Sequence, residues 1–114
     1  MSEDIRAHAR NIPLSAQKVR LVVDLVRGKD AMEALDVLKF VTNRAAHPVT
    51  KVIASAMANA EENFGISRDD LYIHHIYADV APTRRWRRFG ARGRFKPILR
   101  RSSHITVVLR EREN

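Results

Sequence analysis

The chain of 114 residues contains no cysteine, which excludes disulfide bonds, thiolate metal sites and a cysteine nucleophile. No apolar run approaches the roughly 20 residues that a membrane-spanning helix needs. The first residues, 1–6, lack the apolar stretch of a secretory signal. These absences fit an intracellular protein without a disulfide framework and without a membrane-spanning helix.

Acidic residues are absent from residues 83–101, although this segment is strongly cationic. The whole chain has 21 Lys and Arg residues and 13 Asp and Glu residues. Outside the segment it has 12 cations and 13 anions. The formal net charge of +8 therefore comes from one stretch, and such clustering indicates a polyanionic partner. Its nine cations are Arg84, Arg85, Arg87, Arg88, Arg92, Arg94, Lys96, Arg100 and Arg101.

The residue types of this basic segment favour nucleic acid over a membrane surface. Arginine binds phosphate with a bidentate fork, and Trp86, Phe89 and Phe95 offer flat rings on which unpaired bases can stack. A solubilising loop would mix both signs of charge and avoid exposed aromatic residues. A membrane-binding helix would need an amphipathic pattern, which glycine and proline interrupt here.

The remaining sequence predicts three helices and three strands from its hydrophobic periodicity. We expect Ser15 to cap the first helix, Asp30 and Glu33 to form a capping box on the second, and Gly28 and Gly65 to end helices. The charged tail, 110–114, is expected to fray. The predicted order is a strand at 3–12, a helix from Ser15 to Gly28, a short helix from Asp30, a helix at 44–63, and strands at 71–80 and 104–109.

This order predicts an α+β fold: a small three-stranded antiparallel sheet packed on three helices (β-α-α-α-β-β) with a long protruding basic β-hairpin. At about 3.3 Å per residue, an extended arm from Tyr77 to Phe89 spans roughly 40 Å, too long for so small a globule. Folding it back would desolvate nine cations, so projection is favoured. We expect a single domain over 1–114, with a globular core at 1–80 and 102–114 and a hairpin at about 81–101.

Nothing in the sequence predicts an enzyme, a cofactor or a metal site. Adjacent residues of a strand point to opposite faces, so His74 and His75 are expected to lie one inward and one outward, unable to chelate one metal ion. The run 102–104, Ser-Ser-His, lacks the placed third group of a catalytic triad. We therefore expect a binding protein.

Three separated stretches resemble one protein family. Residues 15–29, SAQKVRLVVDLVRGK, resemble the first helix of the large ribosomal subunit protein twenty-two family. Residues 54–61, ASAMANAE, are similar to the end of that family's long helix, and residues 101–108, RSSHITVV, to its closing strand. The sequence departs from the family pattern before the hairpin, at 79–82, and near the tip, at 89–91.

The resemblance implies a structural constituent of the large ribosomal subunit that binds its ribosomal RNA and supports assembly. It implies a globular domain near the exit of the nascent-peptide tunnel and a hairpin whose tip lies in the tunnel wall. Implied partners are large-subunit ribosomal RNA, neighbouring large-subunit ribosomal proteins and the nascent peptide, with no homo-oligomer. The ribosome would be cytoplasmic, although an organellar ribosome stays open.

The resemblance and the basic segment together give the expected site residues. Lys18 and Arg20 match basic positions of the family's first helix, although a solvated helix face explains them equally well. The expected RNA-binding residues are Lys18, Arg20, Arg84, Arg85, Trp86, Arg87, Arg88, Arg92, Gly93, Arg94, Lys96, Arg100, Arg101, Ser103 and His104. The expected tunnel-facing tip is Arg88, Phe89, Gly90, Ala91 and Arg92.

Two alternatives stay open beside this interpretation. One is a free-standing RNA- or DNA-binding module outside the ribosome, which would share the same basic hairpin. The other is an enzyme with an unrecognised site, which substrate turnover at the histidines would reveal.

Overall fold

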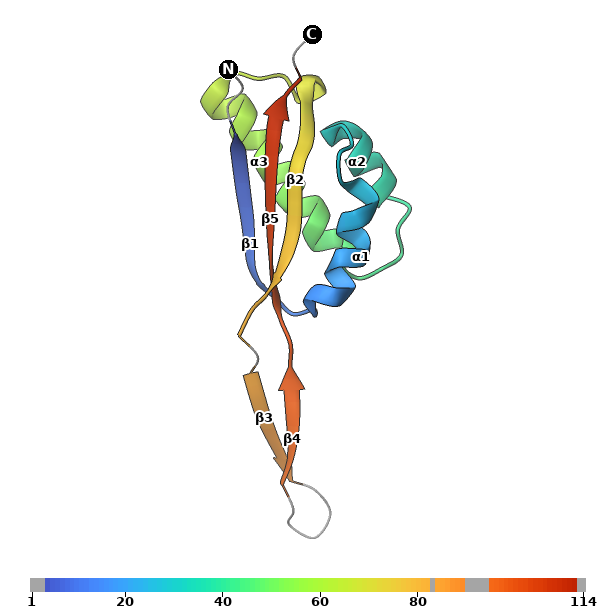
Figure 1. Cartoon of the computed structure of the whole chain (residues 1–114), viewed down its shortest axis with the longest axis vertical. Helices are drawn as coiled ribbons and strands as arrows, with labels where there is room; N and C mark the ends of the chain where they lie inside the picture. Colours follow the sequence, from blue (N-terminus) through green and yellow to red (C-terminus); the bar gives the residue numbers. More distant parts are fainter. Residues whose placement is uncertain (1–3, 83, 90–94, 113–114) are drawn as a thin grey trace.

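The computed structural model describes residues 4–82, 84–89 and 95–112 (Figure 1). It confirms the predicted order of strands and helices, with the basic segment forming a two-stranded ladder between the last two strands of the sheet. The elements are β1 (Ile5–Ile12), α1 (Ala16–Val26), α2 (Ala31–Leu38), α3 (Ala46–Phe64), a short 3₁₀ helix η1 (Arg68–Asp70), β2 (Leu71–Val80), β3 (Arg84–Phe89), β4 (Phe95–Arg100) and β5 (Ser103–Glu111).

The sheet is antiparallel in the order β1-β5-β2, so the last strand of the chain is the central one. The helices pack on one of its faces, which buries one side of each strand (Figure 1). The core combines branched residues of the sheet with the apolar stripes of α1 and α3. Its largest fully buried side chains include Ile5, Ile73, Ile76, Ile105 and Leu109 from the strands and Val19, Val23, Ile53 and Met57 from the helices. The predicted α+β fold is confirmed.

The helix ends follow local sequence at three of the four predicted positions. The Ser15 hydroxyl accepts a hydrogen bond from the Lys18 amide at 3.4 Å, which caps α1. Gly28 and Gly65 have φ of 80° and 64°, a left-handed conformation that other L residues rarely adopt. These predictions are confirmed.

The capping box predicted on α2 is wrong. Asp30 makes no side-chain hydrogen bond to its helix, and its carboxylate instead accepts from Nε of Arg112. Glu33 pairs with Lys29, with 3.5 Å between the charged atoms. The prediction that the tail frays is also wrong as far as residue 112, because the Arg112 amide donates to the Asp70 carbonyl at 2.7 Å and its guanidinium lies over a tyrosine ring.

The molecule is elongated, with principal extents of 67 × 26 × 18 Å. Its radius of gyration is 17.3 Å, against about 13 Å for a compact domain of this size. The excess comes from β3 and β4, which extend beyond the globule as a separate ladder (Figure 1). The basic segment therefore projects, as its length and charge predict.

Candidate nucleic-acid interface

The projecting ladder continues the ribbon formed by β2 and β5. At the junction the Ala81 amide donates to the Ser102 carbonyl at 3.0 Å, and Ala81 is only 1% exposed. The two arms therefore leave the globule from a buried, hydrogen-bonded base. Because β5 is the central strand of the sheet, one arm of the hairpin is anchored directly in the core.

The register of the ladder sets like charges opposite each other. Arg84 pairs with Arg100, and Arg88 pairs with Lys96. Directly opposed like charges destabilise an antiparallel ladder, and a two-stranded ribbon is marginal in water. A ladder built in this way indicates a partner that supplies negative charge along both strands.

The structure places some of the predicted hairpin residues and leaves others outside its description. Two further pairs of the ladder contain aromatic residues. Trp86 pairs with Ile98, and Phe89 pairs with Phe95. The predicted tip residues Gly90, Ala91 and Arg92, and the predicted RNA-binding residues Gly93 and Arg94, lie outside the described residues.

Two hollows at the base of the hairpin bring four cations together from separate parts of the chain. One, of about 340 Å³, is lined by Pro13, Leu14, Ser15, Lys18, Arg44 and Arg101. The other, of about 140 Å³, is lined by Ser15, Ala16, Gln17, Arg20, Val80, Arg101 and Ser102. Neither lining includes an acidic residue among those that the structure describes. We call Lys18, Arg20, Arg44 and Arg101 the basic collar.

The collar cations differ from most other cations of the globule in their pairing. Seven ion pairs join side chains within 4–82 and 101–112, and none includes a collar residue. The paired cations are Arg6, Arg27, Lys29, Lys39, Arg68, Arg110 and Arg112. Most of the cations that enter no ion pair within these ranges are thus gathered at the root of the basic hairpin, with Arg10 and Lys51 elsewhere.

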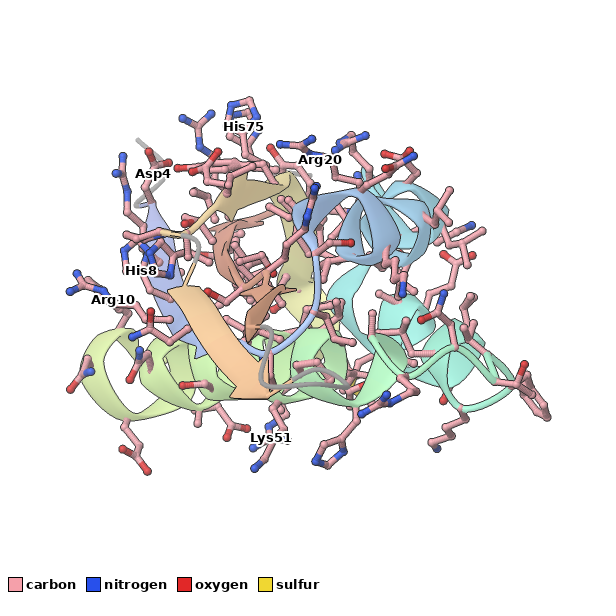
Figure 2. All side chains as sticks on the ribbon, turned by 90° about the horizontal axis from the view of Figure 1, so that it is seen from below. Asp4, His8, Arg10, Arg20, Lys51 and His75 are labelled. Atoms are coloured by element: carbon pink, nitrogen blue, oxygen red, sulfur yellow. The ribbon has the colours of Figure 1, made fainter. Side chains whose placement is uncertain are left out.

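Arg20 contacts the backbone of β2 and still has donors left for a partner. Its Nε donates to the Ala78 carbonyl at 3.1 Å, which fixes the guanidinium beside β2 while the side chain stays exposed. The remaining donors of the fork stay available to a phosphate, because one guanidinium carries five N–H groups. Figure 2, seen from the hairpin end, shows Arg20 between the sheet and α1.

Arg44 was not predicted as a site residue. It lies in the connection before α3, where no periodicity predicts an orientation, and its neighbour Asn43 holds the turn by accepting from the Ala45 amide at 2.9 Å. The predicted helix boundary at residue 44 is two residues early, since α3 begins at Ala46. Only the tertiary fold brings this loop beside α1.

Direct RNA binding was predicted for both Ser103 and His104. The position of His104 fits that role, and the position of Ser103 does not. Ser103 is 0% exposed and its hydroxyl has no partner, so it is turned into the protein and away from any RNA. We therefore leave it out of the interface. His104 is partly exposed, and its Nδ1 accepts from the Asn11 amide at 3.0 Å. That bond leaves the Nε2–H of a neutral ring free to donate outward.

The histidine pair of β2 is arranged differently from the prediction. A β-bulge between Ile73 and His75 shifts the register against β5, so neither His74 nor His75 enters the core. Their ring centroids lie 4.2 Å apart. The prediction of one inward and one outward ring is wrong because strict alternation fails at a bulge. Even so, no group of three or more metal-ligating side chains occurs within the described ranges.

Asp4 and Arg110, which carry opposite charges, lie beside His74 and His75. A hydrogen bond from Arg110 lowers the pKa of the Asp4 carboxyl and raises that of the Arg110 guanidinium. Partial burial first, and then the positive charges of Arg110 and His75, lower the pKa of His74 below 6.5. His74 therefore favours its neutral form at neutral pH.

Within the part of the chain that the structure describes, no helix has the length and apolar character needed to cross a membrane.

Comparison with known proteins gives one consistent result. The profile of the family "Ribosomal protein L22p/L17e" matches residues 7–110. A protein of Dehalococcoides mccartyi named large ribosomal subunit protein uL22 is 53% identical over 106 residues, covering 93% of this chain and 97% of its own length. Proteins of the same name are 50% identical in Cutibacterium acnes, covering 94% of this chain and 70% of their own, and 46% identical in Thermoanaerobacter sp., covering 96% and 99%.

Proposed function

The chain belongs to the ribosomal protein L22p/L17e family, and on that premise we propose that it binds large-subunit ribosomal RNA through its hairpin and basic collar. It is accordingly a structural, non-enzymatic protein of the large ribosomal subunit. In this role its partners are ribosomal RNA and neighbouring ribosomal proteins. The hairpin threads the RNA, supports assembly and carries its tip, 88–92, to the wall of the nascent-peptide tunnel.

The proposal rests on one observation, the location of the positive charge that the protein's own carboxylates do not neutralise. Cations elsewhere on the globule mostly pair with carboxylates, whereas the collar cations do not, and the hairpin register opposes cation to cation. Dense positive charge along one ribbon, together with unpaired collar cations around its root, fits a polyphosphate backbone. Arginine and lysine contacts of this kind fix position on RNA, while the aromatic residues of the hairpin can stack on unpaired bases.

Replacing collar cations tests the RNA contact. We expect the triple variant Lys18→Gln, Arg44→Gln and Arg101→Gln to bind large-subunit ribosomal RNA more weakly than the parent. The slope of log affinity against log salt should become shallower by about one for each phosphate that the variant no longer neutralises. Filter binding over a salt series measures both quantities.

The matched control removes three cations that are engaged in ion pairs: Lys29→Gln, Lys39→Gln and Arg68→Gln. It lowers the net charge equally, so a purely global charge effect would weaken RNA binding by both variants alike. Equal weakening would overturn the collar as a contact site. Affinity of the parent that does not respond to salt would overturn the RNA-binding proposal itself.

A free-standing nucleic-acid-binding module would share these properties. Co-sedimentation of the chain with large ribosomal subunits, at salt concentrations that remove unspecific binding, separates the two roles. Retention in the subunit fraction supports the ribosomal role, and release with retained affinity for free RNA favours the free-standing one.

A further inference from the structure

The open face of the sheet, opposite the helices, collects nearly all the histidine and tyrosine of the chain. Four of the five histidines and both tyrosines project from it, and His47 on α3 is the exception. Figure 2 shows His8 and His75 on the outer side of the strands, away from α3. The six residues, which we call the ring platform, are His8, Tyr72, His74, His75, Tyr77 and His104.

The register shows how the rings cover the sheet. On β5, Val108 pairs with Arg6 on one side and His75 on the other, and Thr106 pairs with His8 and Tyr77. Val108 and Thr106 are only 5% and 6% exposed, although no described helix lies on this face. Their flanking side chains must therefore lie close over the central strand.

Fixed contacts hold parts of this layer in place. His8 Nδ1 lies 3.1 Å from the Thr106 hydroxyl, and the Tyr72 and His74 rings meet edge to face with centroids 6.0 Å apart. The bulge in β2 adds a second imidazole where regular alternation would give one. His8, Tyr72 and His74 are thus held in place, so these rings have little rotamer freedom left to lose on binding.

The platform runs into the basic collar. β1 ends at Ile12, opposite Ser103, and the next residue, Pro13, lines the larger hollow. Arg10, near that end of β1, is exposed and enters none of the ion pairs among the described side chains. Figure 2 shows Arg10 beside His8 on the outer side of β1. Arg10 therefore places one unpaired cation on the open face near the collar, where Asp79, opposite His104, is the nearest exposed carboxylate of β2.

We infer that the open sheet face is a second RNA-binding surface, on which the rings of the platform stack unpaired bases while Arg10 holds the backbone phosphate. This inference rests on the proposed function and extends it to a surface separate from the hairpin. Sheets that present aromatic rings bind single-stranded RNA by base stacking, and cations beside the rings add phosphate contacts. A protein partner is the competing occupant, and the experiments below distinguish the two.

The histidine rings report binding in the intact protein. We expect single-stranded oligoadenylate, added to the full chain, to shift the NMR signals of the ring protons of His8, His74, His75 and His104 upfield and saturably. The His47 ring, on α3, is the internal control and should not shift. Shifts confined to backbone amides of β3 and β4 would overturn the platform and leave RNA binding by the hairpin intact. No shifts in either region would count against the proposed function as well.

Cross-linking in the ribosome identifies which molecule covers the open sheet face. Because the chain has no cysteine, His75→Cys can carry a single photoactivatable cross-linker in assembled large subunits. We expect a cross-link to ribosomal RNA, with Ser55→Cys on the exposed side of α3 as the matched position. A cross-link to a ribosomal protein, or no cross-link to RNA above that of Ser55→Cys, would overturn the inference.

Discussion

His74 illustrates how a single side chain links the open sheet face to folding stability. Its imidazole has a pKa below 6.5 in the folded protein, because of partial burial and of the neighbouring Arg110 and His75. In the unfolded chain the ring binds a proton from about pH 6.5 downwards, while the folded protein resists protonation. Stability from this group is present above pH 6.5 and is lost as the pH falls towards the lower folded pKa.

Replacing this histidine should therefore flatten the pH dependence of stability. Between about pH 7.5 and pH 5.5, we expect the urea midpoint of the parent to fall more than that of His74→Gln. His47→Gln, on the exposed side of α3, controls for loss of a histidine as such. If His74→Gln loses as much stability on acidification as the parent, the assignment of this pH dependence to His74 is wrong.

Individual residues also show where sequence reasoning succeeds. Ser15, Gly28 and Gly65 act through their own backbone or that of residues a turn away, so local pattern predicts them. Asp30 has the same local signature as a cap, but Arg112, 82 residues along the chain, takes its carboxylate. Arg44 becomes part of the collar only when α1 and the loop before α3 meet. Such pairings depend on the tertiary fold, which local pattern does not encode.

Among the elements, the hairpin was predictable from physical limits alone. Its length, its nine cations and the absence of acidic residues exclude packing on a small globule. The bulge in β2 was not predictable. Histidine is compatible with a regular strand and with a bulge, and no glycine marks the position of the residue that the bulge inserts. Strand boundaries at 71–80 follow the run of β-forming residues and match the prediction.

Removing the hairpin tests whether it is an independent element. We expect deletion of residues 84–96, with a short glycine linker, to leave the urea midpoint close to that of the parent, since the described core lies outside the deleted residues. The radius of gyration from small-angle scattering should fall from 17.3 Å towards about 13 Å. Loss of cooperative unfolding would show that the hairpin is required by the core.

The whole molecule combines two proposed binding surfaces of different geometry. The globule offers a broad surface, the collar and the open face of the sheet, while the ladder carries contacts along the 67 Å axis. A protein with this shape can meet RNA segments that are far apart. That reach is what the proposed tunnel contact requires.

The position of the tip is testable in translating ribosomes. We expect a cross-linker on Phe89→Cys, at the end of β3, to capture a stalled nascent peptide. Ser55→Cys on α3 should not capture it, because it lies on the globule. Capture from both positions, or from neither, would contradict the proposed placement of the hairpin in the tunnel wall.

The place of β5 has a mechanical consequence. Any tension on the hairpin tip is transmitted through two arms into strands with different support: β5 pairs with a strand on each side, whereas β2 pairs with β5 alone among the strands of the sheet. A pull along the ribbon loads these ladders in shear, so many hydrogen bonds resist together. The return arm is therefore held by strand ladders on both sides, whereas the outer arm relies for its second support on bonds outside the sheet, such as those from Arg20 to Ala78 and from Arg27 to Ile76.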